Sequence, residues 1–125
     1  MKTFINWSNH PYERWSSKQL EVARSLGELM YIEFPKILPE DSPISIKEQA
    51  ESSVVEIIEK YDNPNDVVIM LQGEMTFLYH ALKLFEQKGY RVVAATTKKL
   101  PPKFTPDGKE IKEFEFVGFR DYFVR

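Results

Sequence analysis

The sequence of 125 residues contains no cysteine. Without a thiol, the chain forms no disulfide framework, no thiolate zinc site and no thiol nucleophile. Long apolar runs are also absent, since none approaches the ~18 residues of a membrane span. The first residues alternate like a strand and have no apolar signal core. We therefore expect a cytoplasmic protein that neither enters a membrane nor is secreted.

An excess of positive charge is missing as well. The chain has 17 lysines and arginines against 19 acidic residues, a net charge of −2. Duplex-DNA binders depend on many Lys and Arg contacts to phosphates, so we expect no general binding to duplex DNA. The net value hides an asymmetry: residues 1–82 carry 7 basic and 13 acidic side chains, whereas residues 83–125 carry 10 basic and 6 acidic ones. A small anionic ligand is compatible with this distribution.

Apolar residues are present in sufficient number for a core. Leucine, isoleucine, valine and phenylalanine make up 36 of the 125 residues, well above the roughly 20% that is typical of disordered chains. No repeat, low-complexity tract or linker divides the sequence. We therefore expect one globular domain over residues 1–125.

Strand-like and helix-like patterns alternate along the chain. Segments rich in β-branched and aromatic residues predict strands over residues 2–7, 28–34, 66–72 and 90–95. Helical spacing of apolar residues predicts three helices. The first is capped by Ser16 or Ser17 and stops at Gly27, the second is capped by Ser45 and runs through Tyr61, and the third begins near Phe77 and ends near residues 88–89. A Pro-Asp-Gly turn at residues 106–108 joins two extended arms. This order predicts a three-layer, Rossmann-like α/β fold with a mostly parallel sheet and a C-terminal β-hairpin.

Three polar segments follow predicted strands: residues 8–11, 72–76 and 96–99. Ligands of open α/β sheets bind outside the carboxyl ends of the parallel strands, so we expect these segments to form the ligand edge. Gly73 ahead of a helix lets backbone N–H groups approach an anion such as a phosphate. His10 can donate to a phosphate or transfer a proton near neutral pH.

The third segment adds two threonine hydroxyls and the ammonium group of Lys98, all of them donors to phosphate. The bases of a nucleotide can stack on Trp7, Trp15 or Tyr12, although these aromatic residues suit a protein core equally well. Lys98 likewise suits a solvated loop.

The residues of the first two segments also have structural explanations. Gly73 suits a tight turn between strand and helix, Thr76 suits a helix cap, and Glu74 suits the helix dipole. His10 suits a turn in which it bonds to the backbone. The sequence has no GxGxxG pattern, no Walker motif and no His, Asp or Glu spacing that is typical of a metal site. We therefore expect neither a cofactor nor a metal ion.

Short strings distributed over nearly the whole chain carry a family resemblance. They are INWSNHP at residues 5–11, QGEMTF at residues 72–77 and AATT at residues 94–97, with Trp15 and Gln19 between the first two. These strings resemble small stand-alone proteins encoded near type III CRISPR loci, which are CARF-like, Rossmann-type domains. The resemblance implies binding of a cyclic oligoadenylate second messenger across a homodimer, and some similar proteins are ring nucleases that cut this messenger.

The resemblance also implies a set of ligand-binding residues. These residues are Ser8, Asn9, His10, Gly73, Glu74, Met75, Thr76, Thr96 and Thr97. Similar proteins carry arginine shortly after the two threonines, where this chain has Lys98 and Lys99. A lysine lacks the bidentate fork of arginine, so this difference bears on cleavage more than on binding.

A metal-independent cleavage follows from the chemistry of an RNA ring. Each 2′-OH lies beside its neighbouring phosphate, so a protein need only hold an in-line geometry and stabilise the added charge. His10 as acid or base and Lys98 as charge stabiliser are the catalytic residues that we expect, and Lys98 also contacts the ligand. The alternative is a non-catalytic nucleotide-binding sensor or sponge, and a third interpretation is a structural partner protein.

Overall fold

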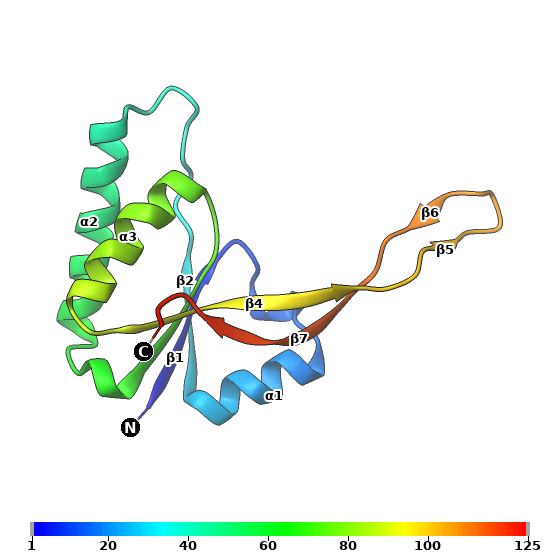
Figure 1. Ribbon diagram of the computed structural model, residues 1–125, viewed down its shortest axis with the longest axis horizontal. Helices are drawn as coiled ribbons and strands as arrows, with labels where there is room; N and C mark the ends of the chain where they lie inside the picture. The colour runs from blue at the N-terminus through cyan, green and yellow to red at the C-terminus, as the bar shows by residue number, and fades with distance from the viewer. Residues whose placement is uncertain (1, 125) are drawn as a thin grey trace.

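Five strands form one sheet in the order β2-β1-β3-β4-β7, as the computed structural model of residues 2–124 shows (Figure 1). The strands are β1 (Thr3–Ser8), β2 (Glu28–Glu33), β3 (Val67–Leu71), β4 (Arg91–Lys99) and β7 (Phe114–Asp121). The first four run parallel, and β7 runs antiparallel to β4. The predicted α/β class with a mostly parallel sheet is thus confirmed.

Helices cover both faces of this sheet, so the chain forms three layers (Figure 1). The helix α1 (Ser17–Leu26) lies on one face, and α2 (Pro43–Lys60) and α3 (Met75–Gln87) lie side by side on the other. Ser16 caps α1 by accepting a hydrogen bond from the backbone of Gln19 at 3.2 Å. Two short 3-10 helices, η1 (Tyr12–Arg14) and η2 (Pro64–Asp66), precede α1 and β3.

The start of α2 differs from the prediction. Ser42, not Ser45, is the cap, and its hydroxyl accepts a hydrogen bond from the backbone of Ser45 at 3.2 Å. Pro43 occupies the first helical position, where its fixed φ suits a helix and its missing N–H costs nothing. The apolar periodicity begins only at Ile46, which explains why the pattern alone placed the start too late.

The strand β4 is longer than predicted. It continues through Thr96 and Thr97 to Lys99 because β7 pairs with it along its whole outer part, with Lys99 opposite Phe114. The register shifts between Thr96 and Thr97, where β7 carries the extra residue Val117. Two strands of this length extend beyond the rest of the sheet as a ribbon (Figure 1).

The predicted C-terminal hairpin is present at the end of this ribbon. The strands β5 (Lys103–Phe104) and β6 (Glu110–Ile111) form a two-stranded sheet of their own. In the turn between them the N–H of Gly108 donates to the carbonyl of Thr105 at 2.9 Å. Gly108 has φ of +87°, a left-handed conformation that glycine adopts without strain.

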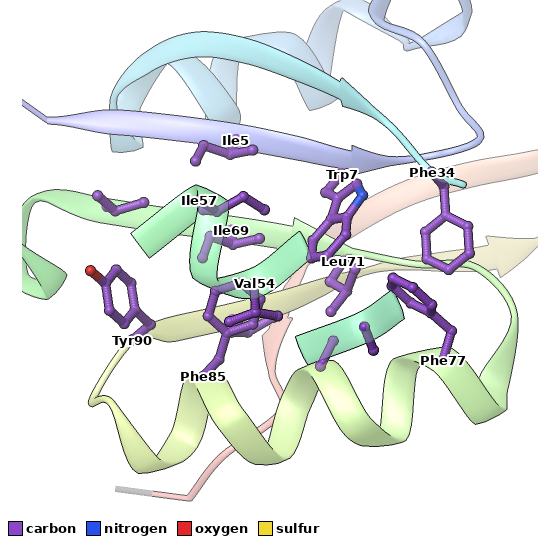
Figure 2. Packing of buried hydrophobic residues seen from close by; sticks show 14 of the residues in the cluster. Ile5, Trp7, Phe34, Val54, Ile57, Ile69, Leu71, Phe77, Phe85 and Tyr90 are labelled. Atoms are coloured by element: carbon purple, nitrogen blue, oxygen red, sulfur yellow. The ribbon is translucent and has the colours of Figure 1, made fainter. Parts of the chain in front are cut away.

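An aromatic cluster fills the space between the sheet and the helices α2 and α3 (Figure 2). Trp7 is 1% exposed, and its ring centroid lies 5.6 Å from that of Phe77 and 6.2 Å from that of Phe85. Phe34 closes the cluster at 5.0 Å from Phe77. Trp7 is therefore a core residue and is not available to stack on a base.

The opposite face of the sheet packs against α1 through a second cluster. Phe4 lies 6.1 Å from Trp15 and 5.2 Å from Phe119, measured between ring centroids. Burial of Trp15 here joins the turn after β1, the helix α1 and the strand β7. Among residues 2–124, no helix is both long and apolar enough to cross a bilayer.

Packing in the first aromatic cluster, beneath α2 and α3, explains why residue 73 is a glycine. A Cβ placed on Gly73 would lie 2.5 Å from two ring atoms of Phe34. The ring lies over the glycine, so the chain can leave β3 at this point only without a side chain.

We expect Gly73→Ala to lower the free energy of unfolding by about 1–3 kcal/mol, because the added methyl group overpacks the ring of Phe34. Urea unfolding followed by circular dichroism measures this loss. The double variant Gly73→Ala/Phe34→Leu should lose less than the sum of the two single variants, since leucine makes room for the methyl group. Strict additivity of the two substitutions would contradict the packing explanation.

Candidate functional site

Two buried polar side chains shape the turn after β1. Asn6 and Ser8 are both 0% exposed. The hydroxyl of Ser8 donates to Oδ1 of Asn6 at 2.6 Å and accepts from the backbone N–H of His10 at 3.1 Å. Nδ2 of Asn6 and Nε1 of Trp15 both donate to the carbonyl of His10, at 2.8 and 2.9 Å. We call these four residues the Asn6 network.

The Asn6 network decides which predicted ligand residues of this turn can reach a ligand. The hydroxyl of Ser8 is buried and already bonded, whereas the side chains of Asn9 and His10 are exposed. Because two donors, from Asn6 and Trp15, hold the carbonyl of His10 inside, the imidazole is left on the outer side of the turn. Ser8 therefore holds the turn in place, whereas the exposed imidazole of His10 is free to contact a ligand.

His10 lines a cavity of about 550 Å³ on the α1 side of the carboxyl edge, which we call the His10 cavity. Its walls come from the turn after β1, from α1, from the ends of β3 and β4, and from β7. The lining residues are His10, Arg14, Trp15, Gln19, Met70, Gln72, Ala95, Thr97 and Phe114. Within the part of the chain that the structure describes, none of the residues that line this cavity is acidic.

The polar groups of the His10 cavity are mostly hydrogen-bond donors. Oε1 of Gln72 accepts from the backbone N–H of Ala95 at 3.1 Å, so the amide NH₂ of Gln72 points elsewhere. Arg14 supplies a permanently charged guanidinium, and Thr97 supplies a hydroxyl. Such a lining suits an anion with several acceptor oxygens.

Glu74 occupies the position that a phosphate would take at the start of α3. Its carboxylate oxygens accept from the backbone N–H groups of Thr76 at 2.9 Å and Phe77 at 3.0 Å. The hydroxyl of Thr76 donates to the same carboxylate. These hydrogen bonds, led by that of the Thr76 hydroxyl, hold the pKa of Glu74 below its ordinary value. The first-turn amides are thus satisfied by the chain itself.

Glu74, Met75 and Thr76 face a different hollow from His10. They line a groove of about 690 Å³ between α3, the start of α2 and the loop before it, which we call the α2–α3 groove. Asn9 lies nearer to this side, since it shares a shallow depression with Glu74 and residues 33–37. The structure therefore divides the predicted ligand residues between the two faces of the sheet.

The residues of the third predicted segment are also divided, because strand residues alternate. Thr97 lines the His10 cavity, whereas the hydroxyl of Thr96 donates to the carbonyl of Gly118 at 2.9 Å. Lys98 lies opposite Glu115 and is exposed. Alternation along β4 directs Lys98 away from the side of Thr97, so the structure does not bring Lys98 and His10 into one cavity.

Three lining residues with hydrophilic side chains were not among the predicted site residues: Arg14, Gln19 and Gln72. Gln72 lies in the segment 72–76 that the sequence already placed at the ligand edge, although no role was given to its side chain. Arg14 ends η1 after β1, so a search of every polar residue behind a strand end would have found it too. Gln19 lies on α1 and reaches the cavity only through packing. Among residues 2–124, no group of three His, Asp or Glu side chains is arranged to hold a metal ion.

A protein-family model described as "Uncharacterized protein MJ1673 family" matches residues 2–120. The chain belongs to the MJ1673 family. The matched region includes every residue of the His10 cavity and of the α2–α3 groove. No curated protein and no solved structure matches this MJ1673-family chain.

In this MJ1673-family chain we expect Glu74→Ala to destabilise the fold by about 1 kcal/mol at pH 7, through loss of the α3 cap. Since the folded-state pKa of Glu74 is lowered, its contribution is complete above the ordinary pKa of about 4.3. The contribution is lost as the pH falls through the folded-state value. Urea unfolding at pH 7 and pH 3 should therefore show a difference between wild type and variant that shrinks in acid.

Glu86→Ala is the matched control for this experiment. Glu86 is exposed near the other end of α3, so its removal should change stability by less than about 0.5 kcal/mol. An equal loss for both variants, or a loss for Glu74→Ala that does not depend on pH, would contradict the capping role.

Proposed function

We propose that this MJ1673-family chain binds a phosphate-bearing nucleotide in the His10 cavity. The observation that carries the proposal is the lining, which joins the guanidinium of Arg14, the imidazole of His10 and the amide of Gln72 with no acidic residue. A guanidinium recognises phosphate oxygens bidentately, and neutral donors complete the shell. Ser8 and the amides near Glu74 already form hydrogen bonds within the protein, so they do not compete for an anion. This supports the His10 cavity as the place where the phosphate binds.

The position of the cavity supports the same proposal. The sheet order reverses between β1 and β3, since β2 lies beyond β1 on one side and β4 lies beyond β3 on the other. In doubly wound folds, ligands bind at this switch point outside the carboxyl ends of the strands. His10 follows β1 and Gln72 follows β3. A Rossmann-like description of the fold belongs to this proposal.

Phe114 is the aromatic residue with which a base can stack. Its side chain is 61% exposed and lines the His10 cavity, whereas Trp15 is 9% exposed. Stacking on an exposed ring is tolerant of base identity and is worth about 1–3 kcal/mol per base. Tyr12, which the sequence also suggested for stacking, has a structural role instead, because its hydroxyl donates to the carbonyl of Met30 at 2.8 Å.

The specific ligand in the proposal is a cyclic oligoadenylate, and it rests on the family resemblance of the strings at residues 5–11, 72–77 and 94–97. A ring of repeated nucleotides presents the same chemistry to two subunits, which favours a cytoplasmic homodimer that supplies the same cavity twice. In this arrangement the donors of each His10 cavity contact one phosphate group of the ring. The exposed side chain of Lys98 contacts the ring only from outside the cavity.

Cleavage of the bound ring is the second candidate function, and it is favoured by the exposed imidazole of His10 in the same cavity as Arg14. The 2′-oxygen forms a bond to the adjacent phosphorus while the bond from phosphorus to the 5′-oxygen breaks. His10 accepts the 2′-OH proton, and a proton from the imidazolium or water passes to the departing 5′-oxygen. Arg14 stabilises the charge on the phosphate. The product is a linear chain with a 2′,3′-cyclic phosphate end.

We expect the purified protein to bind cyclic tetra-adenylate at micromolar concentration, measured by isothermal titration calorimetry. Arg14→Ala removes a charged donor and should weaken binding about 10-fold to 100-fold. Arg24→Ala is the matched control, because Arg24 is exposed in the last turn of α1 and does not line the cavity. Absence of binding, or equal weakening by both variants, would contradict the proposal. Binding of ATP alone would support a nucleotide site and reject the ring.

For cleavage, we expect chromatography to show linear products from cyclic tetra-adenylate with wild-type protein and none with His10→Ala. Binding by His10→Ala should stay within about threefold of wild type, because the donors of Arg14 and Gln72 remain. Lys98→Ala should leave product formation unchanged if Arg14 stabilises the charge, and should abolish it if Lys98 does. No product from wild type would identify a sensor or sponge.

A further inference from the structure

The hairpin beyond the His10 cavity extends away from the rest of the molecule (Figure 1). We call residues 98–113 the arm, since they lie between the cavity residues Thr97 and Phe114. Within residues 2–124, the strands β5 and β6 of the arm pair only with each other. An isolated two-stranded hairpin is marginally stable in water and gains from a partner surface.

The arm carries an exposed aromatic anchor. Phe104 is 67% exposed and lies opposite Glu110 in the pairing of β5 with β6. Interface anchors are most often aromatic residues that enter a pocket on the partner. The arm also holds five lysines and three acidic side chains, a net charge of +2. A partner of the arm therefore needs an apolar hollow within an acidic surface.

The α2–α3 groove has these two properties. Its apolar lining includes Leu38, Met75 and Tyr79, which are 40%, 81% and 57% exposed. Large exposed apolar side chains gathered in one hollow mark an interaction surface. The segments that form the groove, residues 37–48 and 74–80, carry four acidic side chains and one lysine, a net charge of −3. A cavity of about 690 Å³ is large enough for a phenylalanine side chain.

The arm and the groove of one molecule do not meet. The arm leads away from α2 and α3, and the consecutive prolines Pro101 and Pro102 stiffen the chain where it leaves β4 (Figure 1). The complementary surfaces can therefore meet only between two molecules. Because each molecule carries both surfaces, one contact can be repeated reciprocally about a two-fold axis.

We propose that the arm of one copy of this chain docks in the α2–α3 groove of a second copy, with Phe104 between the first turn of α3 and the loop before α2. The second copy makes the same contact in return. The lysines of the arm lie beside the acidic residues that border the groove, which sets the orientation of the contact. This interface forms without a nucleotide, so it stands or falls separately from the proposed function.

Analytical ultracentrifugation of the ligand-free protein tests the interface. We expect wild type to form dimers, and we expect Phe104→Asp or Met75→Asp to raise the dissociation constant at least tenfold. Val55→Asp is the matched control, because Val55 is 45% exposed on α2 outside the groove and should not affect the dimer. A monomeric wild type, or a Phe104→Asp variant that dimerises as tightly as wild type, would overturn the proposal.

A mixture of the two variants separates a specific contact from a loss of folding. Phe104→Asp keeps an intact groove, and Met75→Asp keeps an intact arm, so equal amounts should restore one of the two contacts and part of the dimer. Circular dichroism checks that each variant remains folded. Failure of two folded variants to associate in the mixture, with Val55→Asp unaffected, would reject the reciprocal contact.

The lack of native cysteine allows a direct test of proximity. Glu110→Cys places a thiol beside Phe104 on the arm, and His80→Cys places one in the groove. We expect oxidation of the mixed variants to give mainly the disulfide between different variants, resolved by tags of different mass. Disulfides formed mainly between identical variants would overturn the pairing of arm with groove.

Discussion

The turn after β1 depends on one constraint: β1 is buried on both faces but carries two polar side chains. Asn6 and Ser8 have no access to water, and a buried polar group without a partner costs about 1–3 kcal/mol. The two side chains bond to each other and to the backbone of His10, and Trp15 adds a second donor to the His10 carbonyl. The conformation of the turn therefore satisfies both buried polar groups and also places the imidazole on the outside. The position of α1 follows from it, because Trp15 must reach both the turn and the second aromatic cluster.

The two faces of the carboxyl edge have different chemistry as a result. On the face of α2 and α3, the carboxylate of Glu74 satisfies the first-turn amides, and the surroundings are apolar and acidic. On the face of α1, the lining is free of acids and rich in donors. The second face suits the anion that we propose as ligand, and the first suits the apolar, basic arm that we propose as its partner. The near-neutral net charge of the chain conceals this division, since the opposite charges lie in different parts of the fold.

Periodicity and turn chemistry predicted most of the fold. The parallel strands, the three helices, the C-terminal hairpin and the glycine turn at Gly108 all follow from local patterns. The boundaries were wrong where a partner strand or a proline decided them: β4 continues to Lys99 because β7 pairs with it, and α2 begins at Pro43. Gly73 and Glu74 have the structural roles that the sequence also allowed. The ring of Phe34 packs against Gly73, and the carboxylate of Glu74 accepts hydrogen bonds from two amides of the first turn of α3. The cyclic oligoadenylate ligand stays a prediction from the resemblance.

The sequence by itself determined the fold class, the edge at which polar residues gather and the charge asymmetry, because each of these depends on near neighbours in the chain or on composition. Only the tertiary structure decided which polar residues share a cavity. His10 and Thr97 are 87 positions apart and lie in one cavity with Arg14 and Gln72, whereas Lys98, adjacent to Thr97, faces away. The physical reason is that strand pairing fixes the register and alternation fixes the side, so a shift of one residue moves a side chain to the other face of the ribbon.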